Sequence, residues 1–523
     1  MPTKDKKHKT VKSAETMAVI DIGSNSIRMM IGQALPDGRL EIVERLRRAV
    51  RLGQDVFRTG RIRAETMRSA VGILRDYRHV LNTYGVHRVR AVATSAVREA
   101  ANGDTFVDRA LMAAGLEVSV ISVTEEGRLT VLAVRQALGE KLLRRGKALV
   151  VEVGGGSTVL NVLSHGEITA SQSLPTGSVR MQEVLATTTE RADQAARLIQ
   201  HQITSAIAAF RSLLPLRSVQ TFIAVGGDAR WAAAQVGKPL KTEDLVVVSS
   251  KALGKLIDRC RLQTADELAR SYKIPYTDAE TIMPALLVHQ VLLETTRADR
   301  MIVSDVSVRD GLLLDLARSA AGKADDSAYR EIIQSARSIA QKYQVDAGHA
   351  EQTRRLAVQL FDQLAGEHRL GERHRFLLEV AAILHEVGTF VASRAHHKHS
   401  FYLIANSEIV GLTQDELAVV ANVARYHRRS RPKPSHLDYI SLPRERRMIV
   451  NKLASLLRVA ESLDSSRTQQ IQKLQSRIDG SGLIISVKAG GDFTLERRAL
   501  AEVGDMMLDI YGLEVRLEET GRP

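Results

Sequence analysis

The sequence predicts an α/β protein built from two similar halves, followed by a helical domain and a small α/β cap. Three observations predict this fold class. Two strand–turn–strand segments with glycine-rich turns recur 131 residues apart, from residue 21 to residue 152, each within a run of strands and helices. The apolar residues from 327 to 473 then recur with helical spacing. The last stretch, 474–523, returns to a strand–helix–strand pattern.

The first half is expected over residues 17–135. It follows a basic segment, residues 1–16, whose start MPTKDKKHKTVK carries five lysines with no apolar run behind them, so we expect a disordered tail and not a secretory signal. MAVIDIGSNSIRMMIGQAL indicates two strands joined by a Gly-Ser-Asn turn. RVRAVATSAVREA and EVSVISVTEEGRLTVLAVRQAL each indicate a strand that leads into a helix.

The second half is expected over residues 136–320 and begins with another hairpin, KALVVEVGGGSTVLNVL. Superposing the two hairpins aligns Asp21 with Glu152, Gly23 with Gly154 and Ser26 with Ser157. This offset predicts a duplicated fold with two α/β halves facing each other. Chance similarity of two glycine turns is the alternative. A strand–turn, TFIAVGGDARWAAAQV, and a final strand and helix, IVSDVSVRDGLLLDLARSA, complete this half before the polar linker AGKADDSAY.

The composition favours a polyanionic partner in a reducing compartment. The 523-residue chain has a formal net charge of +14 and a single cysteine, Cys260, which suits the cytoplasm. No apolar run approaches about 18 residues, so no membrane span is expected. Aromatic residues make up only 4% of the chain, which argues against nucleic acid and favours a phosphate polymer. A basic surface that serves only solubility is the alternative.

The glycine turns carry the strongest chemical signal. Each follows a strand that ends in an acid, and backbone N–H groups of such turns can bind phosphate oxygens while the acids hold a bridging divalent cation. A third turn, VGGDAR at 225–230, offers another backbone cradle through Gly226 and Gly227. Most single glycine-rich turns are only structural. Two at matching positions, each preceded by an acid, favour a phosphate site.

VIDIGSNSIRMMI, ATSAVREAAN, ISVTEEGRL, VEVGGGST and LPTGSVR occur in the order seen in the exopolyphosphatase/guanosine pentaphosphate phosphohydrolase (Ppx/GppA) family. The resemblance runs from about residue 17 to the C-terminus. It implies two actin-like domains of the sugar-kinase and actin ATPase fold group. LHEVGTFVASRAHHKHSFYLIANSEI and RYHRR resemble the helical domain of the family's long members, which is similar to HD-type phosphohydrolases.

The resemblance implies specific site residues. Glu126 matches the glutamate that activates water, Arg98 the arginine that faces the phosphates, and Asp21 and Glu152 the acids that hold Mg²⁺. The implied phosphate-binding residues are Gly23, Ser24, Asn25, Ser26, Gly154, Gly155, Gly156, Ser157, Thr158, Gly226 and Gly227. Taken without the resemblance, Arg98 could simply pair within its own helix, and Glu126 would be an ordinary exposed acid at a helix start.

Two departures from the family pattern concern the second hairpin. The family usually has Asp at the position of Glu152 and commonly Glu at the position of Val159. A longer acid and a missing carboxylate should weaken Mg²⁺ binding or turnover, because Mg²⁺ requires tight octahedral geometry. VGGDAR also differs from the Ser-Gly-Thr turn of many members.

The helical domain contributes two further expectations. His349, His385, Glu386 and Asp464 match the HD positions, where Glu386 replaces an Asp; structural histidines are favoured over a second metal site. A basic track for long polyphosphate is expected, with salt-dependent contacts. Its residues are Arg394, His397, Lys398, His399, Arg425, His427, Arg428 and Arg429.

The leading hypothesis is a processive exopolyphosphatase that hydrolyses the terminal phosphoanhydride of inorganic polyphosphate with Mg²⁺, and with K⁺ as a further stimulating ion. The resemblance implies a cytoplasmic homodimer. The enzyme alternative is removal of the 5′-γ-phosphate of guanosine pentaphosphate (pppGpp). A polyphosphate- or (p)ppGpp-binding regulatory protein with weakened catalysis is the alternative from a different class, and a nucleic-acid-binding module has no recognition motif to support it.

Overall fold

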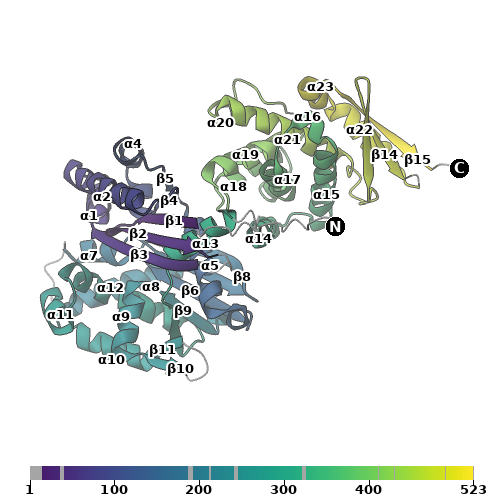
Figure 1. The fold of residues 1–523 in the computed structure, drawn as a ribbon. Coiled ribbons are helices and arrows are strands. Elements are labelled where there is room, and N and C mark those ends of the chain that lie inside the picture. The colour runs from purple at the N-terminus through teal and green to yellow at the C-terminus, as the bar shows by residue number, and fades with distance from the viewer. Residues whose placement is uncertain are drawn as a thin grey trace, which may run out of the picture. The chain divides into compact units, whose positions relative to one another are not determined.

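The computed structural model describes residues 15–35, 40–186, 192–210, 214–240, 245–320, 326–409, 411–428, 430–488 and 490–521. The chain divides into two compact units, Met1–Asp325 and Asp326–Pro523, which are treated separately (Figure 1). Residues 1–14 of the expected basic tail lie outside the described residues. The first strand begins at Glu15 and so takes in the last two residues of that expected tail.

The first unit opens with a five-stranded sheet in the order β3-β2-β1-β4-β5. Its strands are β1 (Glu15–Ile22), β2 (Ser26–Ala34), β3 (Leu40–Ala49), β4 (Arg88–Ala93) and β5 (Val118–Val120). The first three strands pair antiparallel, while β1, β4 and β5 run parallel. Residues 17–22 of β1 are buried throughout, as expected of a strand at the centre of a sheet that is covered on both faces.

The second sheet has seven strands in the order β10-β11-β12-β9-β6-β7-β8. Its strands are β6 (Lys147–Val153), β7 (Thr158–Ser164), β8 (Glu167–Leu174), β9 (Thr221–Val225), β10 (Lys238–Leu240), β11 (Leu245–Ser249) and β12 (Arg300–Val303). The five strands β8-β7-β6-β9-β12 repeat the order and the directions of β3-β2-β1-β4-β5. The expected duplication is therefore present in the sheet topology.

The repeat extends to single residues. In the first hairpin Asp21 pairs across the strands with Arg28, and in the second Glu152 pairs with Val159, so both pairs are related by the same offset of 131. The register shifts between Ile31 and Gly32 and again between Val162 and Leu163, also 131 residues later. Matching register breaks are not required by a glycine turn, so they exclude chance similarity of two turns.

Helices cover both sheets of the first unit (Figure 1). They are α1 (Leu52–Thr59), α2 (Ala64–Thr83), α3 (Ser95–Glu99), α4 (Gly103–Ala114), α5 (Val123–Leu138), α6 (Glu140–Leu143), α7 (Ser178–Ala186), α8 (Ala192–Ala209), the 3₁₀ turn η1 (Leu216–Ser218), α9 (Gly227–Val236), α10 (Ser250–Cys260), α11 (Ala265–Tyr272), α12 (Tyr276–Thr295) and α13 (Val308–Ala320). Two of them, α5 and α13, determine how the halves meet.

Helix α13 ends the second half in sequence but packs on the first sheet. Its residues Val308, Leu312 and Leu313 share a hydrophobic cluster with Met17 and Val19 of β1. It also crosses α5 closely, since a Cβ on Gly311 would lie 1.9 Å from a backbone oxygen of α5. Helix α5 in turn contacts β7 and β8 of the second sheet. The start of α5 is thereby held between the two hairpins.

The second unit combines a helical segment with a small sheet. The helices are α14 (Asp326–Lys342), α15 (Ala347–Gln363), α16 (Ala365–His368), α17 (Glu372–Leu384), the 3₁₀ turn η2 (Val387–Phe390), α18 (His396–Ala405), α19 (Gln414–Arg425), α20 (Leu437–Ile440) and α21 (Arg444–Ser462). The sheet, in the order β13-β14-β15, consists of β13 (Leu474–Asp479), β14 (Gly482–Lys488) and β15 (Glu514–Thr520), with α22 (Thr494–Val503) and α23 (Asp505–Tyr511) between the last two strands.

One hydrophobic core runs through this second unit. Leu474 and Ile485 of the sheet belong to the same buried cluster as Leu356 and Leu457 of the helices. The hydrophobic core is therefore continuous across the expected boundary between residues 473 and 474. Among the described residues, none of the helices combines the length and the apolarity needed to cross a membrane.

Candidate active site

The first glycine turn joins β1 to β2 and is held by its carbonyl groups. Gly23 N–H donates to the Ser26 carbonyl at 3.1 Å, while the carbonyls of Ser24 and Asn25 accept from backbone N–H groups at 2.8 and 3.2 Å. In a trans peptide the N–H points away from the C=O. The N–H groups of Asn25 and Ser26 therefore point away from these partners, and both residues line a cavity.

The second turn is built in the same way. Gly154 N–H donates to the Ser157 carbonyl at 2.9 Å, as Gly23 does to Ser26. The carbonyls of Gly154, Gly155 and Gly156 accept from the start of α7, two of them from backbone N–H groups at 2.9 and 3.0 Å and the third from Arg180 Nε at 2.7 Å. The N–H groups of residues 155–157 consequently point away from α7, as an anion site requires.

The two turns meet closely. A Cβ on Gly155 would lie 3.0 Å from Ser24 Cβ, and a Cβ on Gly156 would lie 2.4 Å from Ser95 Oγ. Ser24 Oγ and Ser95 Oγ are themselves 3.0 Å apart. A side chain on Gly155 would press against Ser24 of the first turn, and one on Gly156 against Phe57 of α1 and Ser95 of α3, so close approach and not an unusual backbone conformation favours glycine at both positions.

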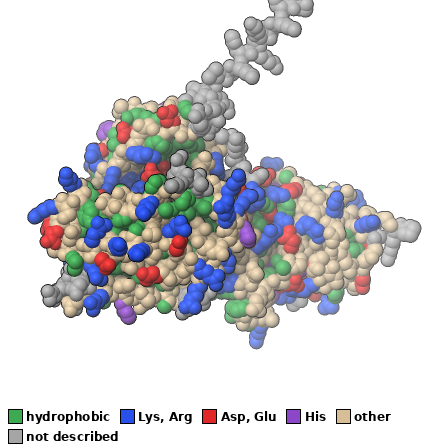
Figure 2. All heavy atoms as spheres, turned by 90° about the horizontal axis from the view of Figure 1, so that it is seen from below, with side chains coloured by type: hydrophobic (Ala, Val, Ile, Leu, Met, Phe, Trp, Pro, Cys, Tyr) green, Lys and Arg blue, Asp and Glu red, His purple; other side chains and the backbone are tan. Residues whose placement is uncertain are grey.

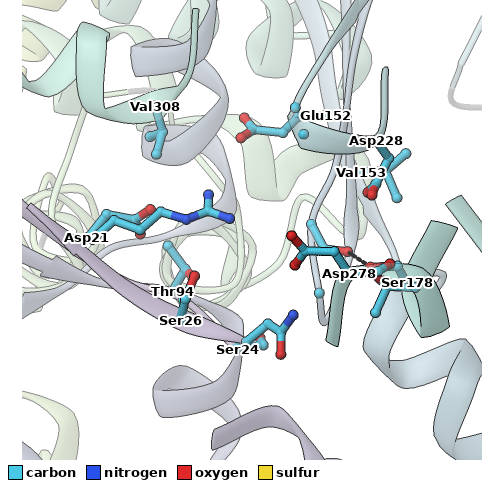
Figure 3. Close-up of a pocket in the computed structure, with 18 of the residues that line it drawn as sticks. Asp21, Ser24, Ser26, Thr94, Glu152, Val153, Ser178, Asp228, Asp278 and Val308 are labelled. Atoms are coloured by element: carbon cyan, nitrogen blue, oxygen red, sulfur yellow. Dashed lines mark hydrogen bonds between the residues drawn. The ribbon is translucent and has the colours of Figure 1, made fainter. Parts of the chain in front are cut away.

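Between the turns lies a cavity of about 360 Å³. Asp21, Glu126 and Glu152 all line it, and Figure 3 shows Asp21 and Glu152 on strands to either side of it. Ser122 caps α5 by accepting from the Glu125 N–H at 3.2 Å, which places Glu126 in the first turn of the helix. Three acids that are far apart in the sequence are thus brought to one cavity.

The environment of Glu126 shifts its acidity. Burial is the largest cause and raises its pKa to about 7, with a further rise from the negative charges of Glu152 and Asp21, while the charge of Arg98 acts against it. Arg98 Nη1 lies 3.6 Å from Glu126 Oε2, an ion-pair distance that is too long for a hydrogen bond. Within the described ranges Glu126 Oε2 has no hydrogen-bond partner. The carboxyl is therefore poised to exchange a proton near neutral pH.

The other two acids have different partners. Glu152 Oε2 accepts from Thr130 Oγ1 at 2.6 Å, and its pKa is raised, mainly by burial. Asp21 Oδ2 lies 3.4 Å from Arg309 Nη1 at the start of α13. Val159, directly across from Glu152, is buried and occupies the position that corresponds to Arg28 in the first hairpin. One acid thus faces fixed cations and the other faces a hydroxyl and an apolar side chain.

The third turn and its helix extend the cavity. Gly226, with φ at +113°, begins α9, and Gly227, Asp228 and Trp231 line the cavity wall. Burial raises the pKa of Asp228 to about 7, and Asp278 adds to the rise. Trp231 stacks edge-on against a tyrosine of α11, with ring centroids 5.0 Å apart, and its indole N–H has no partner in the part of the chain that the structure describes.

Sequence reasoning missed several lining residues. They are Arg28, Arg47, Ser95, Asp228, Trp231 and Asp278. Arg47 forms a two-point ion pair with Asp278, whose shorter distance is 2.5 Å. The hairpin register could have revealed Arg28, because it places that residue directly across from Asp21. Nothing in the sequence relates Arg47 to Asp278, which are 231 positions apart.

Three of the expected site residues do not line the cavity. Gly156 lies against Phe57 of α1 and Ser95 of α3, and Thr158 turns its hydroxyl to the Thr176 carbonyl at 3.0 Å. Arg98 reaches Glu126 but also donates to the Ile121 carbonyl at 2.7 Å. In this structure Arg98 therefore contacts the acid and a backbone carbonyl and does not line the cavity.

The acids fit a hard divalent cation. Asp21, Glu126 and Glu152 offer only oxygen donors, which Mg²⁺ prefers. Their charges oppose one another's ionisation, and Glu126 Oε2 has no hydrogen-bond donor among the described residues, so a cation would supply what the site lacks. Asp21 and Glu152 are therefore suitable ligands, as expected.

The residues of the expected basic track all belong to the second unit. Arg394, Lys398 and Arg428 are exposed, whereas His397 and His399 are half-buried and Arg429 lies outside the described residues. His427 is fully buried, with its pKa well below the ordinary value because of burial, so its place in a surface track is wrong. Arg425 pairs with Asp438 at 2.9 Å and lies over the Phe401 ring. Figure 2 shows Lys and Arg spread among acidic and hydrophobic side chains.

The four HD positions do come together in the second unit. His349 Nδ1 lies 2.8 Å from Asp464 Oδ2, and ligand atoms of His349, His385 and Glu386 lie within 4.8 Å of one another. Asp464 therefore contacts a histidine and does not join the other three as a fourth candidate ligand.

Comparisons with known proteins cover most of the chain. A model of the Ppx/GppA phosphatase family matches residues 30–320, and a model of Ppx/GppA phosphatase domain III matches residues 332–503. The guanosine-5′-triphosphate,3′-diphosphate pyrophosphatase of Aeromonas hydrophila is 26% identical over 482 residues, which are 90% of this chain and 92% of that protein. The protein of the same name from Vibrio campbellii is 26% identical over 505 residues, 94% and 97% of the two chains.

Solved structures agree with these matches. The Ppx/GppA family member of Aquifex aeolicus has a TM-score of 0.50 at 26% identity and covers 60% of this chain and 100% of that one. An exopolyphosphatase from Cytophaga hutchinsonii has a TM-score of 0.53 at 21% identity and covers 58% and 98%. The latter likeness is one of fold alone.

Proposed function

This chain belongs to the Ppx/GppA phosphatase family and is a phosphoanhydride hydrolase, and we propose that it removes the terminal 5′-phosphate of guanosine pentaphosphate. The sequence alone favoured polyphosphate as the substrate, with pppGpp as the enzyme alternative. The observation that carries the proposal is a single cavity in which two amide-lined turns and three carboxylates lie beside a wall containing Trp231.

We propose that Glu126 is the general base. With a pKa of about 7 it is largely ionised at slightly alkaline pH and can take a proton from water. The water oxygen forms a bond to the terminal phosphorus while the bridging P–O bond breaks, and the electron pair leaves on the remaining diphosphate. The products are orthophosphate and guanosine tetraphosphate, and the proton stays on Glu126.

The two glycine turns would bind the phosphates on either side of the scissile bond through the N–H groups of Asn25, Ser26, Gly155 and Ser157. Arg28 and Arg309 lie beside Asp21 and would add positive charge to these phosphates. Asp21 and Glu152 would hold Mg²⁺, which when bound neutralises charge on phosphate oxygens. Catalysis would then depend on positioning and electrostatics.

The wall beyond the turns favours a nucleotide. Ile274, Ile282 and Trp231 give it apolar and aromatic surface, which a base can contact and a bare phosphate chain cannot use. The indole nitrogen of Trp231 is itself buried, so the ring offers a base aromatic contact and not a hydrogen bond. The relatives that match over at least nine-tenths of this chain carry the name of the pentaphosphate enzyme, which supports the same substrate.

Polyphosphate is the second candidate. The turns and arginines recognise phosphate without reference to a base, and the chain's net charge of +14 favours a polyanion. The proposed basic track is weaker than its sequence suggests, because His427 is buried and Arg425 is paired. A homodimer, stimulation by K⁺, an HD-like second unit and a cytoplasmic location stay predictions.

The test compares both substrates on one enzyme. Phosphate release from pppGpp and from long-chain polyphosphate is measured for the wild type and for Trp231→Ala, which removes the aromatic surface from the wall. Loss of an aromatic contact of about 1 kcal/mol should raise KM for pppGpp roughly fivefold and leave polyphosphate hydrolysis unchanged. Equal effects on both substrates, or a higher wild-type kcat/KM on polyphosphate, would reject the pentaphosphate assignment.

Weakened catalysis is tested separately. A regulatory protein would bind either substrate without appreciable turnover, and the apolar Val159 opposite Glu152 motivates this alternative. Tight binding of pppGpp together with a wild-type rate as low as that of Glu126→Gln would establish it.

A further inference from the structure

The second unit contains a cluster of buried histidines that the phosphatase chemistry does not use. His349 on α15 and His385 at the end of α17 are 1% and 0% exposed, and Glu386 beside them is 5% exposed. Their ligand atoms lie within 4.8 Å of one another. Imidazole nitrogens and a carboxylate in this number are the donor set of several zinc sites.

Hydrogen bonds fix the orientation of both rings. His385 Nδ1 faces the Ala382 carbonyl at 2.7 Å, and His349 Nδ1 faces Asp464 Oδ2 at 2.8 Å. A carbonyl oxygen or an ionised carboxylate only accepts, so each Nδ1 carries the proton and each Nε2 presents a lone pair. In metal sites the outer nitrogen of a histidine ligand is normally held in this way.

Both lone pairs are buried without a donor. Neither His349 Nε2 nor His385 Nε2 has a hydrogen-bond partner within the described residues. Burying an acceptor without a partner is costly, so a group that fills this position would be strongly favoured. His368, another buried histidine of this unit, differs: its Nε2 lies 2.7 Å from the Phe361 carbonyl and its Nδ1 accepts from the Leu370 N–H at 2.9 Å. His368 thus has partners for both ring nitrogens, whereas each ring of the clustered pair has a partner for only one among the described residues.

A second pair of rings continues the cluster. His427 Nδ1 lies 2.5 Å from the Ala424 carbonyl and His396 Nδ1 lies 3.1 Å from the Ser393 carbonyl. Their Nε2 atoms face each other at 3.1 Å, and the ring of His427 lies 5.0 Å from that of His385. At this distance the two nitrogens form a hydrogen bond in which one of them carries the proton. His396 and His427 therefore satisfy each other, whereas the Nε2 atoms of His349 and His385 have no partner among the described residues.

We propose that the second unit binds a divalent transition-metal ion, of which Zn²⁺ is the best match, through His349 Nε2, His385 Nε2 and the carboxylate of Glu386. Nitrogen donors favour such ions over Mg²⁺, and three protein ligands leave one position open. Asp464 would act as a positioning residue that orients His349. The ion would join α15 to the end of α17. This differs from the expectation that the histidines are only structural, and it does not depend on the activity proposed for the first unit.

Metal content gives the first test. Full-length protein without a histidine tag is purified in buffers free of chelator, and bound Zn, Fe, Mn, Co and Ni are measured by mass spectrometry. We expect about one equivalent per chain in the wild type, in Asp21→Asn and in His368→Gln, and less than one-tenth in His385→Gln. A wild type that holds none of these metals and gains none on addition overturns the proposal, as does equal binding by His385→Gln.

A second measurement keeps the test valid if His385→Gln does not fold. Wild-type protein is stripped with chelator and titrated with Co²⁺, whose visible absorption reports tetrahedral nitrogen and oxygen ligands. Asp464→Asn should bind Co²⁺ about 10- to 100-fold more weakly with the same spectrum, because it removes only the partner of His349. Absence of the Co²⁺ spectrum in folded wild-type protein overturns the proposal, and so does unchanged affinity in a folded Glu386→Gln variant.

Discussion

Removing the charge of Arg98 should change the pH at which the enzyme works. Its guanidinium lies 3.6 Å from Glu126 Oε2, and the two side chains are 23% and 13% exposed. The positive charge stabilises ionised Glu126 and therefore lowers the pKa of that carboxyl, against the effect of burial. Arg98→Gln removes the charge, so the pKa of Glu126 should rise. As the pH falls, the base should then become protonated and inactive at a higher pH than in the wild type.

The distance sets the size of this shift. Two unit charges 3.6 Å apart attract by about 1.2 kcal/mol even in water-like surroundings, and by more in a partly buried site. Because one pKa unit corresponds to about 1.36 kcal/mol, the pKa of Glu126 should rise from about 7 by roughly one unit or more. Below the pKa the rate should fall tenfold for each pH unit, since only ionised Glu126 accepts a proton.

The assay is kcat/KM for phosphate release between pH 5.5 and 9.5, which reports the ionisation of the free enzyme. The acid limb of the profile should move to higher pH in Arg98→Gln and stay near its wild-type position in Arg98→Lys, which keeps the charge. Glu126→Gln should lose about 10²- to 10⁴-fold in rate at all pH values. An acid limb that is the same in Arg98→Gln and the wild type would refute the argument, and so would substantial activity in Glu126→Gln.

Three further changes test other parts of the site. Gly155→Ala should lower kcat/KM about 10- to 100-fold because its Cβ would separate the two turns, whereas Gly72→Ala, whose Cβ would meet nothing within 4 Å, should leave activity intact. Val159→Glu combined with Glu152→Asp should lower the Mg²⁺ concentration for half-maximal activity about tenfold; an unchanged concentration would show that the apolar residue is no defect. Asp228→Asn should stabilise the free enzyme at pH 8 by a few kcal/mol more than at pH 4.5, because a carboxyl whose folded-state pKa is raised to about 7 costs about 1.4 kcal/mol for each pH unit between its unfolded and folded values. Thermal unfolding at the two pH values checks this, and equal effects at both would contradict it.

The repeated hairpin was predictable because its signal is local. A strand, an acid and a glycine turn lie within about ten residues, and the offset of 131 that aligns Asp21 with Glu152 also aligns the register breaks of both sheets. The place of Glu126 was different. Only family resemblance indicated it, because the acid reaches the cavity through the packing of α5 between α13 and the second sheet.

Contacts between distant segments could not be predicted. Arg309 reaches Asp21 from 288 residues away because α13 returns to the first sheet, which no periodicity in the sequence indicates. The basic run RYHRR suggested a solvated surface, yet Tyr426 and His427 are fully buried. They follow the last turn of α19, which packs against α18, and the charged neighbours in the sequence concealed this.

The unequal partners of the two hairpin acids have a consequence for cellular conditions. Arg309 lies 3.4 Å from Asp21, and Arg28 is paired with Asp21 across the hairpin, whereas Glu152 has a hydroxyl and Val159 beside it, and burial raises its pKa although the charges of both arginines oppose the rise. A nucleotide that arrives chelated brings positive charge to Glu152, whereas the same nucleotide without its counterion adds negative charge beside that carboxylate. The enzyme should therefore distinguish two ionic forms of one molecule. A fall in free divalent cation would slow it even when the amount of nucleotide stays constant.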